Sequence, residues 1–315
     1  MQSFDINATP ARDEGQKRST VRPVDTVALA RAVRRLNQAA SPPWLHGEVA
    51  RRMVERLPIV KLQPATVVDW GSFIGGSRAL LQAAYPPARL IAVEPDAMRR
   101  DATVVASALP WWSPTRWLGQ GSLALTPDAL GVGQCQLLWA NMVLHGVADP
   151  QAEMQRWHRV LAVDGFLMFA TLGPGTLGGL RTLYAQQGWP MPFAPFVDMH
   201  DLGDMLLHAG FADPVMDQEQ ITLTWPTAEA ALAELRSLGA NVALARHSGL
   251  RTPRWWALLT QQLQAVCSRD GRVALDFEVV YGHAFRPAPR PRLAAQTSVP
   301  LDDLRAMVRA GRSPR

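Results

Sequence analysis

The sequence predicts an α/β fold in which helices cover both faces of a doubly wound, mostly parallel sheet. Short β-rich apolar runs alternate with helical patterns from residue 66 to residue 171, and the first run leads into a glycine-spaced turn. This alternation is typical of βαβ units, whose successive strands lie parallel. The chain has 315 residues, of which 48% are hydrophobic, enough to bury one large core. We therefore expect one domain with a long insertion rather than two domains.

Two amphipathic helices are expected before the first strand. Leu29, Val33 and Leu36 have the spacing of an apolar helical stripe, and a second stripe follows and ends at Pro58. The polar sides of these helices carry the arginines Arg31, Arg34, Arg35, Arg51, Arg52 and Arg56. Such a basic face can bind an anionic partner, although a merely solvated face is about as probable on sequence grounds.

The remaining elements follow from periodicity. Strands are predicted at 66–69, 90–94, 136–141 and 166–171, helices at 78–85 and 151–161, and a further strand around 116–118. Beyond residue 171, glycine and proline separate short helical pieces, which is typical of a helical lid insertion at about 173–265. Expected within the insertion are helices at 176–187, 201–209 and 228–238 and a strand at 219–225, and a strand at 274–284 follows it. The expected parts of the chain are a flexible tail at 1–22, the domain at 23–290 and a C-terminal tail at 291–315.

Composition excludes several classes of protein. The N-terminus has no apolar signal-peptide core, and no stretch approaches the roughly 18 apolar residues of a membrane span. Cys135 and Cys267 are too few and too far apart for a disulfide framework or a metal site. A cytoplasmic location is therefore expected. The formal charge of +5 suggests an anionic partner, but nucleic acid is disfavoured because no nucleic-acid-binding motif is present.

The turn after the first strand has the features of a nucleotide-type cofactor site. Asp69 ends the strand, and Gly71 and Gly75 allow the backbone to approach a ligand. Glu94 ends the next strand, where an acid can accept hydrogen bonds from ribose hydroxyls. Phe73 occupies the position where pyrophosphate would need a glycine, which favours S-adenosylmethionine, a cofactor without phosphate.

Several segments extend this pattern beyond the cofactor turn. They are Trp139-Ala140-Asn141-Met142-Val143-Leu144-His145, Trp157-His158-Arg159-Val160-Leu161, Ala170-Thr171-Leu172-Gly173-Pro174-Gly175-Thr176-Leu177, Leu238-Gly239-Ala240-Asn241 and Phe277-Glu278-Val279-Val280-Tyr281-Gly282. With them, residues 45–287 resemble the class I S-adenosylmethionine-dependent methyltransferases. More narrowly, they resemble the malonyl-acyl-carrier-protein O-methyltransferases of biotin synthesis.

This resemblance implies a Rossmann-like, seven-stranded fold, S-adenosylmethionine as cofactor, and O-methylation of the free carboxylate of a malonyl thioester on acyl carrier protein. The residues that it assigns to the cofactor are Asp69, Gly71, Phe73, Gly75, Glu94 and Asn141. The turn would line the methionine end and Glu94 would hold the ribose. Asn141 would lie where the fourth strand opens toward cofactor and substrate.

Methylation of a carboxylate requires no general base, because the nucleophile is already ionised at neutral pH. The protein has only to desolvate and orient it. The candidates for orienting the substrate are Arg181, which can grip a carboxylate, and His145, which is expected to line the pocket. The N-terminal arginines are candidates for binding an acidic carrier protein.

Three departures from the family pattern leave alternatives open. Phe73 replaces the middle glycine of the turn, where its side chain could occupy cofactor space. An acid on the adenine side is not evident around Gln120 and Gly121, and Gly146 replaces an aromatic residue. The chain could therefore be a degenerate methyltransferase that acts as a binding or regulatory partner, or a methyltransferase for another small acceptor.

Overall fold

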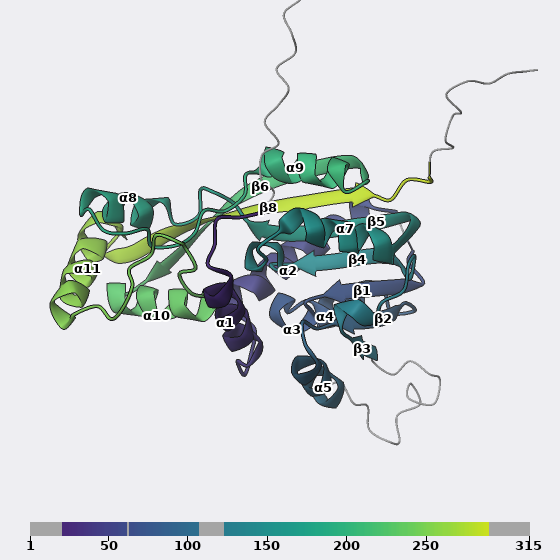
Figure 1. Cartoon of the computed structure of the whole chain (residues 1–315), viewed down its shortest axis with the longest axis horizontal. Helices are drawn as coiled ribbons and strands as arrows, with labels where there is room; N and C mark the ends of the chain where they lie inside the picture. Colours follow the sequence, from purple (N-terminus) through teal and green to yellow (C-terminus); the bar gives the residue numbers. More distant parts are fainter. Residues whose placement is uncertain (1–20, 62, 107–122, 290–315) are drawn as a thin grey trace, which may run out of the picture.

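The computed structural model describes residues 21–61, 63–106 and 123–289, which form three layers around one sheet (Figure 1). The strand order is β3-β2-β1-β4-β5-β8-β6, with the two-residue β7 paired to β8. Neighbours from β3 to β5 are parallel, whereas β8 is antiparallel to both β5 and β6. The predicted doubly wound, mostly parallel sheet is confirmed, and β7 is an addition to the expected seven strands.

The parallel part of the sheet follows the predicted alternation closely. Its strands are β1 (Thr66–Trp70), β2 (Arg89–Val93), β3 (Leu123–Leu125), β4 (Cys135–Asn141) and β5 (Leu161–Leu172). The helices that connect or precede them are α1 (Thr26–Asn37), α2 (Trp44–Arg56), α3 (Ser72–Gly75), α4 (Arg78–Ala84), α5 (Ala97–Ala106) and α7 (Pro150–Val160). Local signals set their ends: the Asp149 side chain accepts from the backbone of Ala152, and Pro150 occupies the first turn of α7.

The antiparallel part carries the lid. It consists of β6 (Ala212–Trp225), β7 (Ser268–Arg269) and β8 (Arg272–Phe285). The β6–β8 pairing continues to Trp225 and Val273, well beyond the last β5 partner at Val279. That free end of the hairpin supports the lid helices α8 (Gly178–Gln186), α10 (Ala228–Leu238) and α11 (Pro253–Val266), while α9 (Met199–His208) lies over the sheet (Figure 1).

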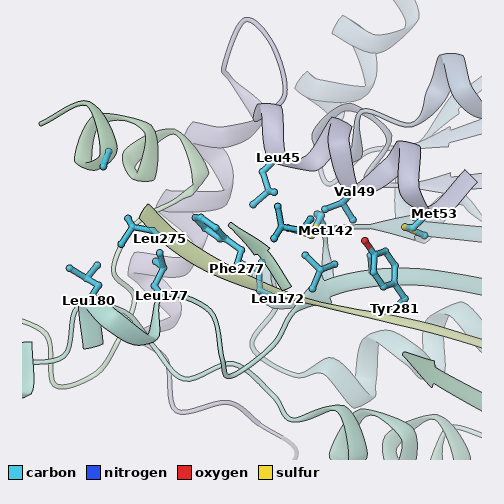
Figure 2. Close-up of a cluster of buried hydrophobic side chains, with 14 of the residues drawn as sticks. Leu45, Val49, Met53, Met142, Leu172, Leu177, Leu180, Leu275, Phe277 and Tyr281 are labelled. Atoms are coloured by element: carbon cyan, nitrogen blue, oxygen red, sulfur yellow. The ribbon is translucent and has the colours of Figure 1, made fainter. Parts of the chain in front are cut away.

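Successive residues of each strand serve opposite faces of the sheet. On β4, Leu138 packs with α7 and α9, whereas Trp139 packs with α2 and α4. The Trp139 side of the core continues without a break into the lid, where its apolar side chains meet those of α8 and β8 (Figure 2). Lid and sheet therefore share one hydrophobic core.

Some elements of the structure differ from the sequence predictions. Helices α5 and α11 were not predicted, and β6 begins at Ala212 because pairing with β8 extends it. The expected strand at 116–118 and most of both tails lie outside the described residues. The predicted boundary of the N-terminal tail is wrong at Arg22, which is 7% exposed and hydrogen-bonded.

Within the described residues, no helix is long and apolar enough to cross a membrane. The same residues contain no cluster of histidine, cysteine, aspartate and glutamate that could hold a metal ion.

Candidate functional site

A cavity of about 610 Å³ opens where the carboxyl ends of β1, β2 and β4 meet the lid. Gly71, Glu94 and Met142, each of which directly follows one of these strands, form its sheet side. Helix α1, the lid helices α8, α10 and α11, and loop segments around residues 145 and 193 contribute to the rest of its wall. The cavity thus lies at the point where the strand order reverses between β1 and β4, the usual ligand site of such sheets.

The glycine turn requires its first glycine for two reasons. Gly71 has φ +69°, and a Cβ atom there would lie 2.5 Å from the Val143 side chain. Its N–H donates to the carbonyl oxygen of Val93, which joins the turn to β2. Gly76, at φ +63°, ends the short helix α3. The turn therefore presents backbone, with no side chain at Gly71, to the cavity.

Phe73 does not line the cavity. Its ring lies against the Arg99 guanidinium, 3.7 Å from the ring centroid, and its N–H donates to Glu94 Oε1 at 3.1 Å. The backbone of Phe73 thus positions Glu94 while the benzyl group points elsewhere. The obstruction of cofactor space that the sequence raised is not present in this conformation.

Glu94 lines the cavity with an unsatisfied acceptor. Its Oε1 accepts from Phe73 N–H and from Thr103 Oγ1 at 2.8 Å, whereas Oε2 is buried without a partner among the described residues. Burial raises the pKa of Glu94 to about 7, and the nearby Asp69 carboxylate adds to the shift. A buried acceptor with a free lone pair matches a ligand that offers hydroxyl donors.

Asp69 and Asn141 support the turn from behind and do not line the cavity. Asp69 is fully buried, accepts from Ser72 Oγ at 2.6 Å, and has its pKa raised to about 6 by burial. The Asn141 amide donates to the carbonyl oxygens of Gly75 at 2.6 Å and His46 at 2.7 Å. These contacts hold the turn against β4 and α2. Direct contact of either residue with a ligand stays a prediction.

His145 lines the cavity, in the place expected for it. Its ring packs edge-on against His46 and Phe196, with centroids 6.0 and 6.2 Å away. Burial lowers the pKa of His145 well below its usual value, and the neighbouring His46 and Arg22 contribute. The imidazole is therefore neutral at neutral pH and can act only as a neutral hydrogen-bonding group.

Arg181 lies on α8 away from the cavity lining. It is exposed and donates to the carbonyl oxygen of Pro174 at 2.9 Å. The glycines of the preceding turn pack against β8. Gly175 N–H donates to Glu278, and a side chain at Gly173 would overlap the Glu278 carboxylate. A substrate contact by Arg181 stays a prediction that this arrangement does not support.

Arg22 is a wall residue that the sequence analysis missed. It lines the cavity from the segment before α1, and its guanidinium donates to the carbonyl oxygens of His145, Val147 and Pro195. No local pattern marks this arginine, because it follows the irregular N-terminal stretch. Its position in the cavity wall becomes clear only from the path of the folded chain.

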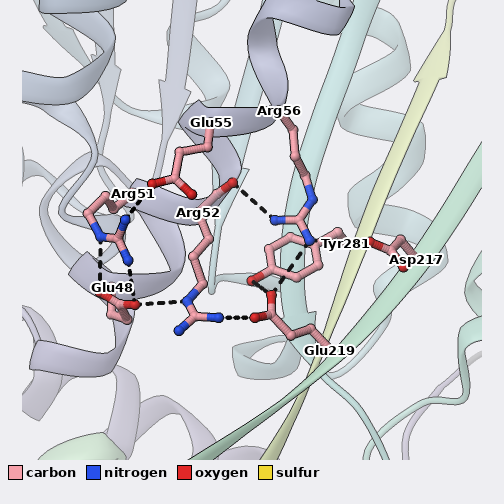
Figure 3. A network of polar contacts seen from close by, with 8 residues as sticks. All are labelled: Glu48, Arg51, Arg52, Glu55, Arg56, Asp217, Glu219 and Tyr281. Atoms are coloured by element: carbon pink, nitrogen blue, oxygen red, sulfur yellow. Dashed lines mark hydrogen bonds and ion pairs between the residues drawn. The ribbon is translucent and has the colours of Figure 1, made fainter.

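The arginines of α1 and α2 differ in their partners. Figure 3 shows those of α2 in a network with acids: Arg51 with Glu48 and Glu55, Arg52 with Glu48 and Glu219, and Arg56 with Asp217 and Glu219. On α1, Arg31 and Arg34 are exposed and have no ion pair within the described part of the chain. Of these two helices, α1 is therefore the one whose face carries arginines without an ion pair to a described acid.

Comparison with known proteins shows two relatives of similar length. The chain is 39% identical over 258 residues to the malonyl-[acyl-carrier protein] O-methyltransferase of Laribacter hongkongensis, covering 79% of this chain and 84% of the relative. It is 38% identical over 251 residues to the enzyme of the same name from Gallionella capsiferriformans, covering 78% and 85%. No family model matches the chain.

Among solved structures, the YcgJ protein of Bacillus subtilis is similar in fold. The TM-score is 0.51 at 10% identity, and the match covers 77% of this chain and 99% of that protein. At this identity the likeness concerns the fold alone.

Proposed function

This chain belongs to the malonyl-[acyl-carrier protein] O-methyltransferase family, and from that premise we propose that it methylates the free carboxylate of a malonyl thioester on acyl carrier protein. The methyl donor is S-adenosylmethionine, and the product enters biotin precursor synthesis in the cytoplasm. The observation that carries the proposal is one continuous cavity that joins the unsatisfied acceptor of Glu94 to an apolar chamber under the lid.

The residues of the sheet side fit this cofactor. Glu94 Oε2 is a free acceptor for ribose hydroxyls, and the Gly71 backbone can be approached closely because a Cβ atom is absent. Val93 and Pro95 border the same part of the cavity with apolar surface, which suits an adenine ring. When bound, the cofactor supplies an electrophilic methyl group on a sulfonium.

The protein's own contribution is to orient a carboxylate and to exclude water. No residue has to remove a proton, because a carboxylate is ionised at neutral pH. The lid side of the cavity is lined by Tyr184, Phe193, Trp255 and Trp256, whose apolar surfaces exclude water from the reacting groups. Neutral His145 can position the substrate but cannot supply charge.

Docking of the acidic carrier protein belongs to the same proposal and rests on α1. Arg31 and Arg34 are exposed on the helix whose other side lines the cavity through Leu29 and Val33. Complementary charge on this side of the cavity wall would steer an acidic partner toward the site. The arginines of α2 contribute less, because neighbouring acids neutralise them.

The test is incubation of the purified protein with S-adenosylmethionine and malonyl carrier protein, followed by intact-mass analysis. We expect one methyl adduct with wild type and far less with Glu94→Ala. Absence of the adduct together with clear S-adenosylhomocysteine binding would indicate another acceptor. Absence of cofactor binding by calorimetry would instead favour a degenerate binding protein, for which the outward position of the Phe73 ring gives no support.

Carrier docking is tested separately with Arg31→Glu and Arg34→Glu combined. The double variant is expected to raise KM for malonyl carrier protein about tenfold at low salt while leaving KM for a small malonyl thioester unchanged. The matched control is Arg89→Glu, at the opposite end of β2. An equal change for both substrates would contradict docking through α1.

A further inference from the structure

Arg22 is a buried cation in the cavity wall. Its side chain and backbone are only 7% exposed, and its three hydrogen-bond acceptors are backbone carbonyl oxygens, those of His145, Val147 and Pro195. Its Nε atom is buried and has no partner among the described residues. The three carbonyl contacts use three of the five guanidinium N–H donors, so Nε–H and one N–H of Nη2 have no acceptor among the described residues, in a wall that is otherwise mostly apolar.

No acid in the described part of the chain neutralises this charge. The two carboxylates that line the cavity have other partners: Glu94 bonds to Thr103, and Glu153 accepts from the Trp70 indole at 2.7 Å. His145, whose carbonyl oxygen accepts from Arg22, and the adjacent His46 are not acids, and burial lowers the pKa of both imidazoles. Burial also lowers the pKa of Arg22, but arginine stays protonated at neutral pH.

An unneutralised buried cation is costly unless something compensates it. Carbonyl dipoles compensate part of the charge, and an anionic ligand would compensate the rest. The guanidinium geometry matches a carboxylate, which can accept two parallel N–H donors.

The segment that carries Arg22 is held in place from both sides of the cavity. The Arg22 N–H donates to the carbonyl oxygen of Ala148 at 2.8 Å, on the loop before α7. Val24 forms a β-bridge with Ala243, and Asp25 pairs with Arg246 at 2.6 Å, both in the lid insertion. The guanidinium is therefore preorganised, which lowers the entropy lost when a ligand binds.

We infer that Arg22 is the specificity residue that recognises the free carboxylate of the acceptor and separates substrate from methylated product. This inference rests on the proposed function, because it assigns the carboxylate of that reaction to one residue. It places the role at Arg22 instead of Arg181, whose guanidinium lies outside the cavity lining.

The charge change during methyl transfer determines how a contact between Arg22 and the carboxylate affects the reaction. A bond forms between a carboxylate oxygen and the methyl carbon, while the carbon–sulfur bond breaks and its electron pair remains on sulfur. The carboxylate and the sulfonium both become neutral. A cation beside the carboxylate therefore interacts more strongly with the ionised substrate than with the ester, so it contributes mainly to KM and favours release of product.

The experiment measures binding of two ligands in the presence of S-adenosylhomocysteine, so that no methyl is transferred. A small malonyl thioester and its methyl ester are titrated into wild type, Arg22→Gln, Arg22→Lys and the control Arg89→Gln. Wild type and the control should prefer the free acid by at least roughly tenfold, as expected for a charged hydrogen bond. In Arg22→Gln the preference should fall to about one, with Arg22→Lys intermediate.

A merely structural role gives a different pattern. Loss of backbone contacts would weaken acid and ester equally, would leave their ratio at the wild-type value, and would overturn the inference. Should Arg22→Gln fail to fold, as judged by S-adenosylhomocysteine affinity, the ratio in Arg22→Lys decides. Loss of the preference in Arg181→Gln with Arg22 variants unaffected would transfer the role to Arg181.

Failure of the proposed function is distinguishable from failure of this inference. If wild type neither binds the malonyl thioester nor forms a methyl adduct, the proposed function fails and the inference fails with it. If wild type forms the adduct and Arg22→Gln keeps the preference for the acid, only the inference fails.

Discussion

The two sides of the cavity are built by different means. The sheet side consists of tight backbone turns and buried polar groups, with Gly71 and Glu94 directly at the surface of the cavity. The lid side consists of aromatic and aliphatic side chains, among them Tyr184 and Trp255, which pack against one another with centroids 6.3 Å apart. A backbone turn tolerates almost no change, whereas packed side chains can readjust. Substitutions on the sheet side should therefore have larger and more specific effects than those on the lid side.

The largest effect is expected for Gly71→Val. A β-branched residue at φ +69° is strained, and its Cβ would lie 2.5 Å from the Val143 side chain. Affinity for S-adenosylhomocysteine should fall by about a hundredfold or more, as measured by calorimetry. The control is Gly47→Ala on α2, where a Cβ meets nothing within 4 Å and helix stability should rise slightly. Equal S-adenosylhomocysteine affinities in the two variants would contradict the expectation that the turn tolerates substitution less well than the helix.

Glu94→Gln should lower S-adenosylhomocysteine affinity roughly tenfold at pH 8, because a charged acceptor is replaced by a neutral one.

The affinity of the wild-type protein for S-adenosylhomocysteine should also depend on pH. The pKa of Glu94 is raised to about 7, so the carboxyl is protonated below that pH and must lose its proton to accept two hydroxyl donors. Affinity should therefore fall as pH decreases from 8 to 6, by at most about tenfold per pH unit. A pH profile that remains equally steep in Glu94→Gln would assign the effect to another group.

On the lid side, Trp255→Ala should raise KM for the malonyl thioester by roughly fivefold and leave S-adenosylhomocysteine affinity within about twofold of wild type. Trp255 packs on Trp189 at 5.2 Å between centroids and lines the lid part of the cavity. The two constants are measured on the same preparation. A loss of cofactor affinity as large as the rise in KM would show that the two sides are not separable.

The smallest effect is expected for Phe73→Gly. The ring lies against Arg99 outside the cavity, so its removal costs about 0.5–1 kcal/mol of cation–π energy in stability. Affinity for S-adenosylhomocysteine should change less than about threefold, because the Glu94 contact of residue 73 is made by its backbone N–H. A gain in affinity of more than tenfold would show that the ring enters the cofactor space in solution.

Much of the parallel sheet could be predicted because local patterns specify it. The alternation of apolar runs and helices located β1, β2, β4 and α7 to within one residue, whereas β5 begins five residues before its predicted start; the spacing of Asp69, Gly71 and Glu94 indicated a ribose-binding edge. Helix α11 carried usable signals, since Thr252 caps it and Pro253 occupies its first turn. Helix α5 has a cap in Asp96, whose side chain accepts from Arg99 N–H, but Thr103 is its only buried residue in the described structure, so little packing marks its length.

The sequence by itself determined the fold class, the position of the glycine turn and the family, because periodicity and glycine spacing are local properties of the chain. Only the tertiary structure decided which polar side chains reach the cavity. It turned the Phe73 ring outward, placed Asn141 behind the turn, left Arg181 at the surface and brought Arg22 into the wall. The physical reason is that each of these positions depends on packing between segments far apart in sequence, such as residues 22, 145 and 195, which no local pattern encodes.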